Sequence, residues 1–418
     1  MIAKLSSSKI YRVFLVYLSF FLRGFSFLII APYATRLIPP DYWGAVLSAQ
    51  ALGLWVTLIL DYGFNVTGTR NLVSLLNNKL SISSAISGIY TAKFILLIPS
   101  FIVVVLGVHF SSLKNYTVLS LFIVFWAAAQ SFGPVWYFQA TDRLHIYALT
   151  DIFSRLLYML LIFIFLRSSE DYYLIIVLQF LTILISTIVQ CTIMSLETGS
   201  KIFKLSLVDG INALRSGWSI SIFTIITSVY TAAGIFILGI FVPSHQVAIY
   251  GNADRLARAG LSMFGPINQI IAPRIYSLVH QGLRESIKYI YRISAFYFPV
   301  AVLIFFLIIL LAKPAITILF GDSYIESANI LRLLGLLFPI IALNTILSSF
   351  VLIPLGKDNY VTVVYSIASA LSLGAMIILI PRVGIVGMAY SVIIPEAFAS
   401  ISLGFQVYKI LRRNLAES

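Results

Sequence analysis

The chain has 418 residues, of which 60% are hydrophobic and only 10% are charged. Soluble domains carry about a quarter charged residues, so this composition excludes a soluble globular protein and indicates one that lies almost entirely in a membrane. The net charge of +13 would suggest nucleic-acid binding in a soluble protein, but in a membrane protein the basic residues of cytoplasmic loops explain most of it. The single cysteine and four scattered histidines exclude an internal disulfide and show no metal-ligand spacing, so neither a cofactor nor a nucleic-acid partner is expected.

Apolar segments of about 20 residues recur along the whole chain, and each is long enough to cross ~30 Å of hydrocarbon. They predict an all-α membrane protein with twelve transmembrane helices. In chain order the predicted spans cover residues 10–32, 44–69, 83–108, 115–138, 147–166, 172–195, 214–242, 247–272, 288–312, 327–352, 359–380 and 384–408. The connecting segments are short, and none has room for a folded domain outside the membrane.

Basic residues are distributed unevenly between alternate loops. If the N-terminus is cytoplasmic, seventeen Lys and Arg residues fall on the cytoplasmic side. Only five fall on the other side: Arg36, Lys114, Arg167, Lys313 and Arg382. Because basic residues concentrate in cytoplasmic loops, the sequence predicts that both termini face the cytoplasm.

A weak internal repeat divides the chain into two halves. The segment RLIPPDYWGAVLSAQ from Arg36 leads into the second span, and GIFVPSHQVAIYGNADR from Gly239 leads into the eighth. Both contain a proline, a short polar stretch, a tyrosine and a glycine that opens a helix. A six-span repeat returns to its starting side, so the sequence predicts two lobes of equal orientation, residues 1–200 and 201–418. Transporters built from such parallel repeats bind substrate between their halves.

The eighth span carries an unusual set of charges in YGNADRLARAG, Tyr250 to Gly260. On a helix, Asp254, Arg255 and Arg258 fall on one polar stripe. A charge that faces lipid at mid-bilayer costs at least ~2.5–3.5 kcal/mol, so this stripe is expected to face water or polar protein groups. Asp254 and Arg258 are i,i+4 neighbours that can pair, and Asp254 would then orient Arg258.

Two more basic residues lie deep in other predicted spans. Arg23 lies in the first span and Lys93 in the third. Together with Arg255 and Arg258, they are the candidates for a cationic substrate-binding cavity. Arginine matches phosphate oxygens with its planar fork of donors, so such a cavity suits an anionic ligand.

Acidic residues in the spans leave more than one interpretation open. Glu396, at mid-depth in the twelfth span, and Asp61, in the second span, are candidates for coupling transport to an ion. Either carboxylate could instead form a structural pair with a basic residue. Asp151 and Arg155 lie one turn apart in the fifth span, near an interface, and are interpreted as a structural pair.

Five segments of the chain, taken in this order and together with the number of spans, match a known family of membrane proteins: ILDYGFNVTGTR, PVWYFQATDRL, YGNADRLARA, PINQIIAPRIYSL and LFGDSYIESANILRLL. With them the chain resembles the polysaccharide-biosynthesis flippases of the multidrug/oligosaccharidyl-lipid/polysaccharide (MOP) exporter superfamily, in particular the bacterial O-antigen flippases. No single motif is specific, and the ordered set carries the resemblance.

The resemblance implies a V-shaped bundle of two six-helix lobes that acts as a transporter and not as an enzyme. Such proteins move oligosaccharide repeat units linked to undecaprenyl pyrophosphate across the bacterial inner membrane by alternating access, for lipopolysaccharide or other surface polysaccharide. By position, Arg23 and the Arg255/Arg258 pair match their cationic cavity sites. The implied partners are the lipid-linked oligosaccharide, membrane lipids, and the polymerase and chain-length regulator of the same pathway.

Two other functions compete with this interpretation. A cation-coupled drug exporter of the same superfamily would have an anionic cavity for cationic substrates, whereas the spans hold six basic residues against four acidic ones. A membrane O-antigen polymerase would have a similar hydropathy pattern but usually needs a large periplasmic loop for its sugar chemistry. The outer loops predicted here are too short for that.

Overall fold

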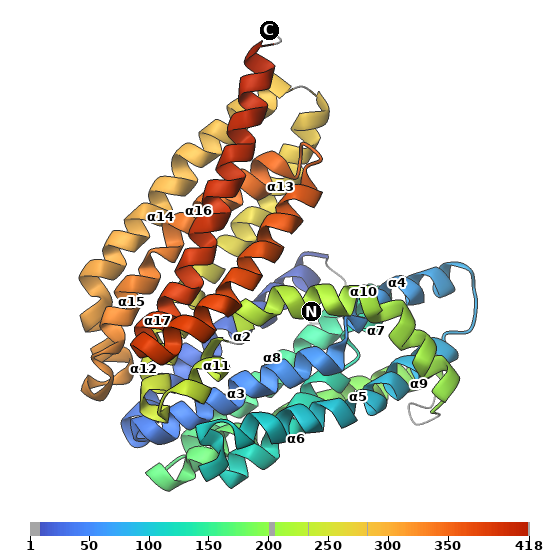
Figure 1. The fold of residues 1–418 in the computed structure, drawn as a ribbon. Helices are drawn as coiled ribbons and strands as arrows, with labels where there is room; N and C mark the ends of the chain where they lie inside the picture. Colours follow the sequence, from blue (N-terminus) through green and yellow to red (C-terminus); the bar gives the residue numbers. More distant parts are fainter. Residues whose placement is uncertain (1–8, 200–204, 233, 282, 417–418) are drawn as a thin grey trace. The chain divides into compact units, whose positions relative to one another are not determined.

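The computed structural model of the chain is built from helices (Figure 1). It describes residues 9–199, 205–232, 234–281 and 283–416, and this part of the chain contains no β-strand. The all-α fold class is therefore confirmed. The chain forms two compact units, unit 1 with Met1–Ser228 and Pro243–His245, and unit 2 with Val229–Val242 and Gln246–Ser418. The two lobes expected from the repeat, residues 1–200 and 201–418, stay a prediction.

Unit 1 is a bundle of long helices around an apolar core. Its helices are α2 (Lys9–Leu37), α3 (Pro40–Asp61), α4 (Phe64–Asn77), α5 (Ser83–His109), η1 (Ser112–Asn115), α6 (Thr117–Phe132), α7 (Val135–Ala140), α8 (Leu144–Phe165), η2 (Ser169–Tyr173), α9 (Leu174–Thr198) and most of α10 (Leu207–Ala232). Helix α2 packs against α8, α3 packs against α6, and α9 packs against both α6 and α8. Residues 43–53 of α3 are buried without interruption, so α3 is the central helix of this unit.

Two membrane helices of unit 1 are broken. The predicted span 44–69 is divided into α3 and α4 at Tyr62 and Gly63, whose φ angles are 45° and 74°. Glycine enters this left-handed region freely, and a residue with a Cβ does so only at a cost. The predicted span 115–138 is divided into α6 and α7 at Gly133 and Pro134, because proline has no N–H to donate and its ring clashes with the preceding turn.

Unit 2 contains the second set of helices. They are α11 (Gly234–Phe241), α12 (Ser244–Ser262), α13 (Phe264–Gln281), α14 (Leu283–Phe320), η3 (Asp322–Tyr324), α15 (Ser327–Gly335), α16 (Leu337–Thr345), the π-helix η4 (Ile346–Leu352) and α17 (Asp358–Ala416). Helix α14 packs against α13, α15 and α16, and α17 packs against α11, α16 and η4. Within α17 the backbone leaves the helical conformation at Val383 and Gly384, which is the boundary expected between the last two spans.

Nine helical segments of the described residues are long and apolar enough to cross a membrane. One of them, Asp358–Ile410, contains both of the last two predicted spans. The predicted spans 214–242 and 247–272 are not among the nine. Residue 233 lies outside the described residues, the helix is interrupted at Met263, and α12 carries the charges of the polar stripe. The protein therefore crosses the membrane many times.

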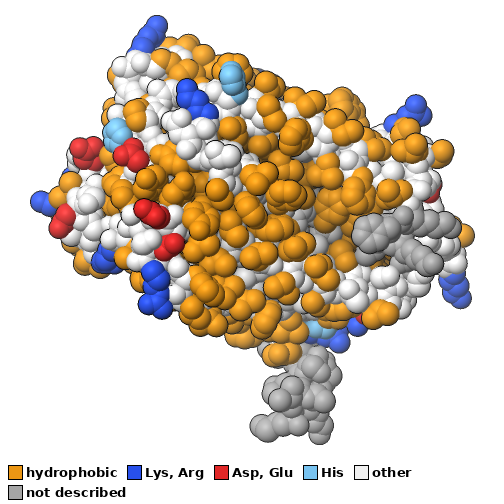
Figure 2. Space-filling model, turned by 90° about the horizontal axis from the view of Figure 1, so that it is seen from below, with side chains coloured by type: hydrophobic (Ala, Val, Ile, Leu, Met, Phe, Trp, Pro, Cys, Tyr) orange, Lys and Arg blue, Asp and Glu red, His pale blue; other side chains and the backbone are white. Residues whose placement is uncertain are grey.

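The outer surface of the helices is rich in large apolar side chains. Ile98 of α5, Leu310 of α14 and Ile401 of α17 are among them, and each is at least two-thirds exposed. Figure 2 shows one face of the molecule, on which hydrophobic side chains form a continuous field and charged side chains lie toward the margins. An apolar area of this extent would promote aggregation in water, so it is the surface that contacts lipid. The chain is a multi-pass membrane protein.

Candidate functional site

In unit 1, Asp151 of α8 is the centre of a polar cluster between α2 and α8. Its Oδ2 accepts hydrogen bonds from Ser19 Oγ at 2.7 Å and from Arg155 Nε at 3.0 Å. Arg23 Nη2 lies 3.5 Å from Asp151 Oδ1 and donates to the hydroxyl of Tyr147 at 3.3 Å. Two arginines share one carboxylate, so this cluster carries net positive charge.

The two arginines of this cluster differ in exposure. The Arg155 side chain is 16% exposed and holds Asp151 with both Nε and Nη2, so the structural pair expected from the spacing is present. The Arg23 side chain is 45% exposed. Arg155 therefore anchors the carboxylate, while nearly half of the Arg23 side chain remains exposed. A binding role for Arg23 stays a prediction.

Lys93 of α5 and Asp61 of α3 form an ion pair in the interior of unit 1. Lys93 Nζ lies 3.6 Å from Asp61 Oδ1, and the Lys93 side chain is only 1% exposed. Ser131 of α6 joins the two, because its hydroxyl donates to Asp61 Oδ1 at 2.8 Å and accepts from Lys93 Nζ at 3.2 Å. The structure thus gives Lys93 a carboxylate partner on another helix. A contact between Lys93 and substrate stays a prediction.

This ion pair lies at the break between α6 and α7. Helix α6 ends at Phe132, so its last carbonyls have no partner within the helix. Side chains of neighbouring helices donate to three of these carbonyls: Thr187 Oγ1 to Ala129 O, Tyr90 Oη to Phe132 O and Lys93 Nζ to Ser131 O. A cation at this position is also favoured by the dipole of α6. Lys93 therefore neutralises Asp61 and caps a helix inside the membrane, where water cannot satisfy the backbone.

In unit 2, a cavity of about 320 Å³ lies among α12, α16 and α17. Its polar lining includes Asp254, Arg258, Asn344 and Glu396. Arg258 Nε donates to Asp254 Oδ2 at 2.7 Å, so the i,i+4 pair expected from the spacing is formed. Asp254 is 6% exposed and Arg258 is 39% exposed. As in unit 1, a buried aspartate anchors an arginine that remains partly exposed.

Glu396 is held in this cavity by Asn344. Asn344 Nδ2 donates to Glu396 Oε2 at 2.8 Å and to the Glu396 carbonyl at 3.1 Å. Ser400 Oγ donates to Asn344 Oδ1 at 2.6 Å, and Ser348 Oγ donates to the Asn344 carbonyl at 2.6 Å. Ser348 belongs to η4, and π-helical segments inside membrane helices often lie at functional sites.

The sequence analysis missed Asn344. The signal was an amide well inside the apolar span 327–352, since a polar side chain at that depth needs a hydrogen-bond partner. Arg255 of α12 is half-buried, and the described residues that line the cavity include Arg258 but not Arg255. The structure therefore brings Asp254, Arg258 and Glu396 together. Within unit 1 it pairs Arg23 with Asp151 and Lys93 with Asp61.

A model of the polysaccharide biosynthesis protein family matches residues 13–279, which is more than half of the chain. The chain belongs to the polysaccharide biosynthesis protein family. Among curated members of similar sequence, a Shigella dysenteriae protein provisionally named an O-antigen transporter is 26% identical over 91% of this chain and 96% of its own length. An Escherichia coli (strain K12) protein with the same provisional name is 26% identical over 59% of this chain and 60% of its own length. The resemblance drawn from the five segments is confirmed.

Solved structures show that this member of the polysaccharide biosynthesis protein family has the fold of the MOP superfamily. The lipid II flippase MurJ in an inward closed conformation matches with a TM-score of 0.70 over 96% of this chain and 88% of that chain, at 14% identity. An inward-facing multidrug resistance transporter of the MATE family matches with a TM-score of 0.66 over 94% of this chain and 96% of that chain, at 13% identity. At such low identity these matches establish the architecture alone.

Proposed function

We propose that this protein is a flippase that moves lipid-linked O-antigen repeat units across the bacterial inner membrane. The carrier would be undecaprenyl pyrophosphate, and transfer would run from the cytoplasmic to the periplasmic leaflet. The observation that carries the proposal is an arrangement of charges that the helices of both units share. In each unit a buried aspartate, Asp151 or Asp254, anchors a partly exposed arginine, Arg23 or Arg258. Family membership and the provisional names of the relatives support it.

Arginine suits the phosphate groups of such a substrate. Its planar guanidinium binds phosphate oxygens in pairs, is weakly hydrated and stays charged at any physiological pH. Arg23 and Arg155 together outnumber the single carboxylate of Asp151, so the cluster keeps the positive charge that a pyrophosphate needs. Arg255 adds a second cation beside Arg258 in α12. In this proposal these arginines bind the headgroup, and the two units alternate its access to the two leaflets.

The cavity of unit 2 supplies a candidate for coupling to an ion. Asp254 and Glu396 place two carboxylates in one cavity with the amide of Asn344. Oxygen ligands of this kind hold hard cations, and carboxylates also exchange protons. We propose that protonation of Glu396, or a cation bound beside it, changes the preferred conformation of unit 2. Asp61 is the alternative coupling residue, and its pairing with Lys93 favours a structural role.

The location and partners follow from the same proposal. A flippase of this kind would lie in the inner membrane with both termini in the cytoplasm, where the basic loops were assigned. It would deliver its substrate to the polymerase and chain-length regulator of the pathway. Alkaline phosphatase fused after Ala416 tests the orientation, because this reporter is active only outside the cytoplasm. Active fusions would contradict the cytoplasmic C-terminus.

Deletion of the gene in its host tests the function. We expect surface O-antigen to disappear and intact lipid-linked repeat units to accumulate on the inner leaflet, and the wild-type gene on a plasmid should restore both. If single repeat units still reach the surface but long chains do not, the protein acts in polymerisation and the proposal fails. Unchanged surface sugar and unchanged lipid-linked units would also contradict it.

A drug exporter is the second candidate, because the unit 2 cavity contains two carboxylates for one lining arginine. Such a cavity suits a cationic substrate. The deletion strain separates the two functions, since loss of an exporter would raise sensitivity to cationic drugs and leave surface sugar unchanged.

A further inference from the structure

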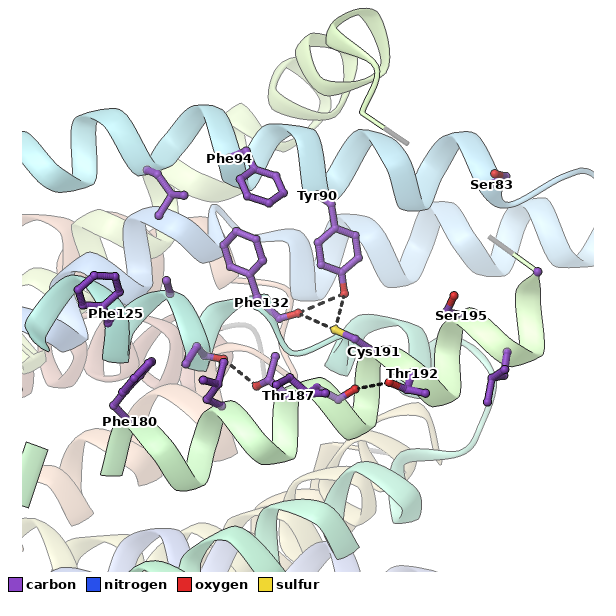
Figure 3. A pocket seen from close by; sticks show the side chains of 17 residues that line it. Ser83, Tyr90, Phe94, Phe125, Phe132, Phe180, Thr187, Cys191, Thr192 and Ser195 are labelled. Atoms are coloured by element: carbon purple, nitrogen blue, oxygen red, sulfur yellow. Dashed lines mark hydrogen bonds between the residues drawn. The ribbon is translucent and has the colours of Figure 1, made fainter. Parts of the chain in front are cut away.

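A long apolar groove runs along α5, α6 and α9 of unit 1 (Figure 3). It encloses about 1320 Å³, which is more than the ~300–1,000 Å³ of ordinary ligand pockets. Five of its lining residues are aromatic: Tyr90, Phe94, Phe125, Phe132 and Phe180. Others, such as Ile188 and Leu196, are exposed, so the groove opens toward the apolar surface of the bundle.

The groove is elongated along the helices. On α5 its lining extends from Ser83 to Leu97, and on α9 from Phe180 to Leu196. At a rise of about 1.5 Å per residue, these stretches cover roughly 20 Å of the ~30 Å thickness of the hydrocarbon core. A site of this length suits a chain, and a compact ligand would leave most of it empty.

Polar side chains in the middle of the groove are already bonded within the protein. Tyr90 Oη donates to Phe132 O at 3.2 Å, and Cys191 Sγ donates to the same carbonyl at 3.7 Å. Thr187 Oγ1 donates to Ala129 O at 2.7 Å, and a dashed line marks the hydrogen bond at Thr187 in Figure 3. A sugar buried here would lose hydrogen bonds to water without gaining new ones, which is costly. A hydrocarbon needs none, so the lining suits an apolar occupant.

One end of the groove is polar. Ser83 and Ser195 line it there, and Ser83 also lines an adjoining cavity of about 380 Å³. That cavity contains Glu197, which pairs with Arg143 at 2.5 Å and accepts a hydrogen bond from Tyr137 at 2.7 Å. An apolar trough with a polar cavity at one end matches an amphiphile that has a long chain and a headgroup.

We propose that this groove binds a stretch of the polyprenyl chain of the lipid-linked substrate. A polyprenyl chain carries a methyl branch in every repeat and is wider and stiffer than a straight acyl chain. A wide, aromatic groove therefore matches it better than it matches the acyl chains of bulk phospholipid. The groove also touches the broken end of α6, because Phe132 lines it while the preceding residue, Ser131, contacts Lys93 and Asp61. This inference rests on the proposed function.

The only cysteine of the chain reports on the groove. Cys191 is half-buried and lines the groove floor. The experiment is the rate of maleimide alkylation of the purified protein in detergent, titrated with undecaprenyl phosphate. A bound chain blocks the thiol, so at ten times the dissociation constant the rate should fall about tenfold. The matched control is Leu160→Cys in a Cys191→Ser background, because Leu160 is exposed on α8 outside the groove, and its rate should not change.

Each result decides the proposal. Protection of Cys191 alone by undecaprenyl phosphate supports it. Equal protection by phosphatidylglycerol would assign the groove to bilayer lipid and overturn it, as would the absence of protection by either lipid. If the thiol does not react at all, photolabelling with a polyprenyl phosphate that carries a diazirine in its chain replaces the assay. Labels should map to α5, α6 and α9, and labels confined to other helices would overturn the proposal.

The two proposals fail in different ways. If deletion removes surface O-antigen but undecaprenyl phosphate neither protects Cys191 nor labels the groove, the flippase stands and the groove assignment falls. If deletion leaves the surface sugar and the lipid-linked units unchanged, the flippase falls whatever the labelling shows. Filling the groove with Ala128→Phe links the two, because Ala128 lines it. We expect this variant to lose both the protection of Cys191 and most complementation.

Discussion

The ammonium of Lys93 lies 3.6 Å from the carboxylate of Asp61, although the two residues belong to different helices of unit 1. The Lys93 side chain is 1% exposed and that of Asp61 is 27% exposed, and burying a charge is costly unless a partner and hydrogen bonds compensate it. Ser131 supplies those hydrogen bonds from a third helix. The pair therefore joins α3, α5 and the end of α6, and it can be tested as a structural unit.

Loss of either charge of this pair should destabilise the protein more than loss of both. Lys93→Met leaves Asp61 without its cation, and Asp61→Leu leaves Lys93 without its anion. We expect each to cost about 3–5 kcal/mol, because an unpaired buried charge remains. The double variant should recover a large part of that loss. Thermal unfolding of the purified proteins in detergent measures this, and a double variant as unstable as the sum of the singles would show that the two charges are not coupled.

Arg23 and Arg155 should separate function from stability. Arg23→Ala removes the more exposed of the two arginines of the Asp151 cluster, 45% exposed against 16% for Arg155, and exposed ion pairs contribute only about 0–1 kcal/mol. We expect nearly normal unfolding but a loss of surface O-antigen in the complementation assay. Arg155→Ala removes the anchoring hydrogen bonds of Asp151 and should lower stability by about 1–3 kcal/mol.

Arg23→Lys is the matched control for this pair of variants. It keeps the charge and loses the planar fork that pairs with phosphate oxygens, so complementation should be intermediate. Full surface O-antigen from Arg23→Ala at normal protein level would remove Arg23 from the substrate site.

Asp254 and Arg258 should act as one unit in transport. Asp254→Asn weakens the charge-assisted hydrogen bond at 2.7 Å that orients Arg258. We expect it to reduce complementation nearly as much as Arg258→Ala, and the double variant should be no worse than Arg258→Ala alone. Effects of two residues that work through one contact do not add. An additive loss in the double variant would show that Asp254 acts on something other than Arg258. Arg255→Ala, on the same helix, is the comparison for Arg258→Ala.

Glu396 should control the response to an ion gradient. In membrane vesicles, wild-type transport of the lipid-linked unit should fall when the proton or sodium gradient is collapsed. Glu396→Gln keeps the shape of the side chain but leaves no negative charge to bind a proton or a cation. The residual transport of this variant should therefore no longer depend on the gradient. Asn344→Leu removes the 2.8 Å hydrogen bond to Glu396 and should shift the pH dependence of transport. A wild-type gradient response in Glu396→Gln would exclude this residue from coupling.

Much of the architecture could be predicted from the sequence because it depends on local properties. The apolar segments predicted a helical membrane protein. The break of the fourth span at Pro134 also has a local cause, since a missing N–H acts within one turn. The pairs Asp254–Arg258 and Asp151–Arg155 could also be predicted, because residues four apart are neighbours on any helix. The break at Tyr62 and Gly63 lies inside an apolar span and was not anticipated.

The sequence by itself therefore determined the fold class, the family and the contacts that lie on one helix. Only the tertiary structure decided which helices face each other: Lys93 with Asp61, Arg23 with Asp151, and Asn344 with Glu396. Residues on separate helices are brought together by the packing of those helices. Because a membrane helix is apolar all round, its hydrophobic pattern does not indicate which side faces a neighbouring helix. The groove lined by α5, α6 and α9 also depends on tertiary structure, since its shape is set by how these three helices pack and not by the sequence of any one of them.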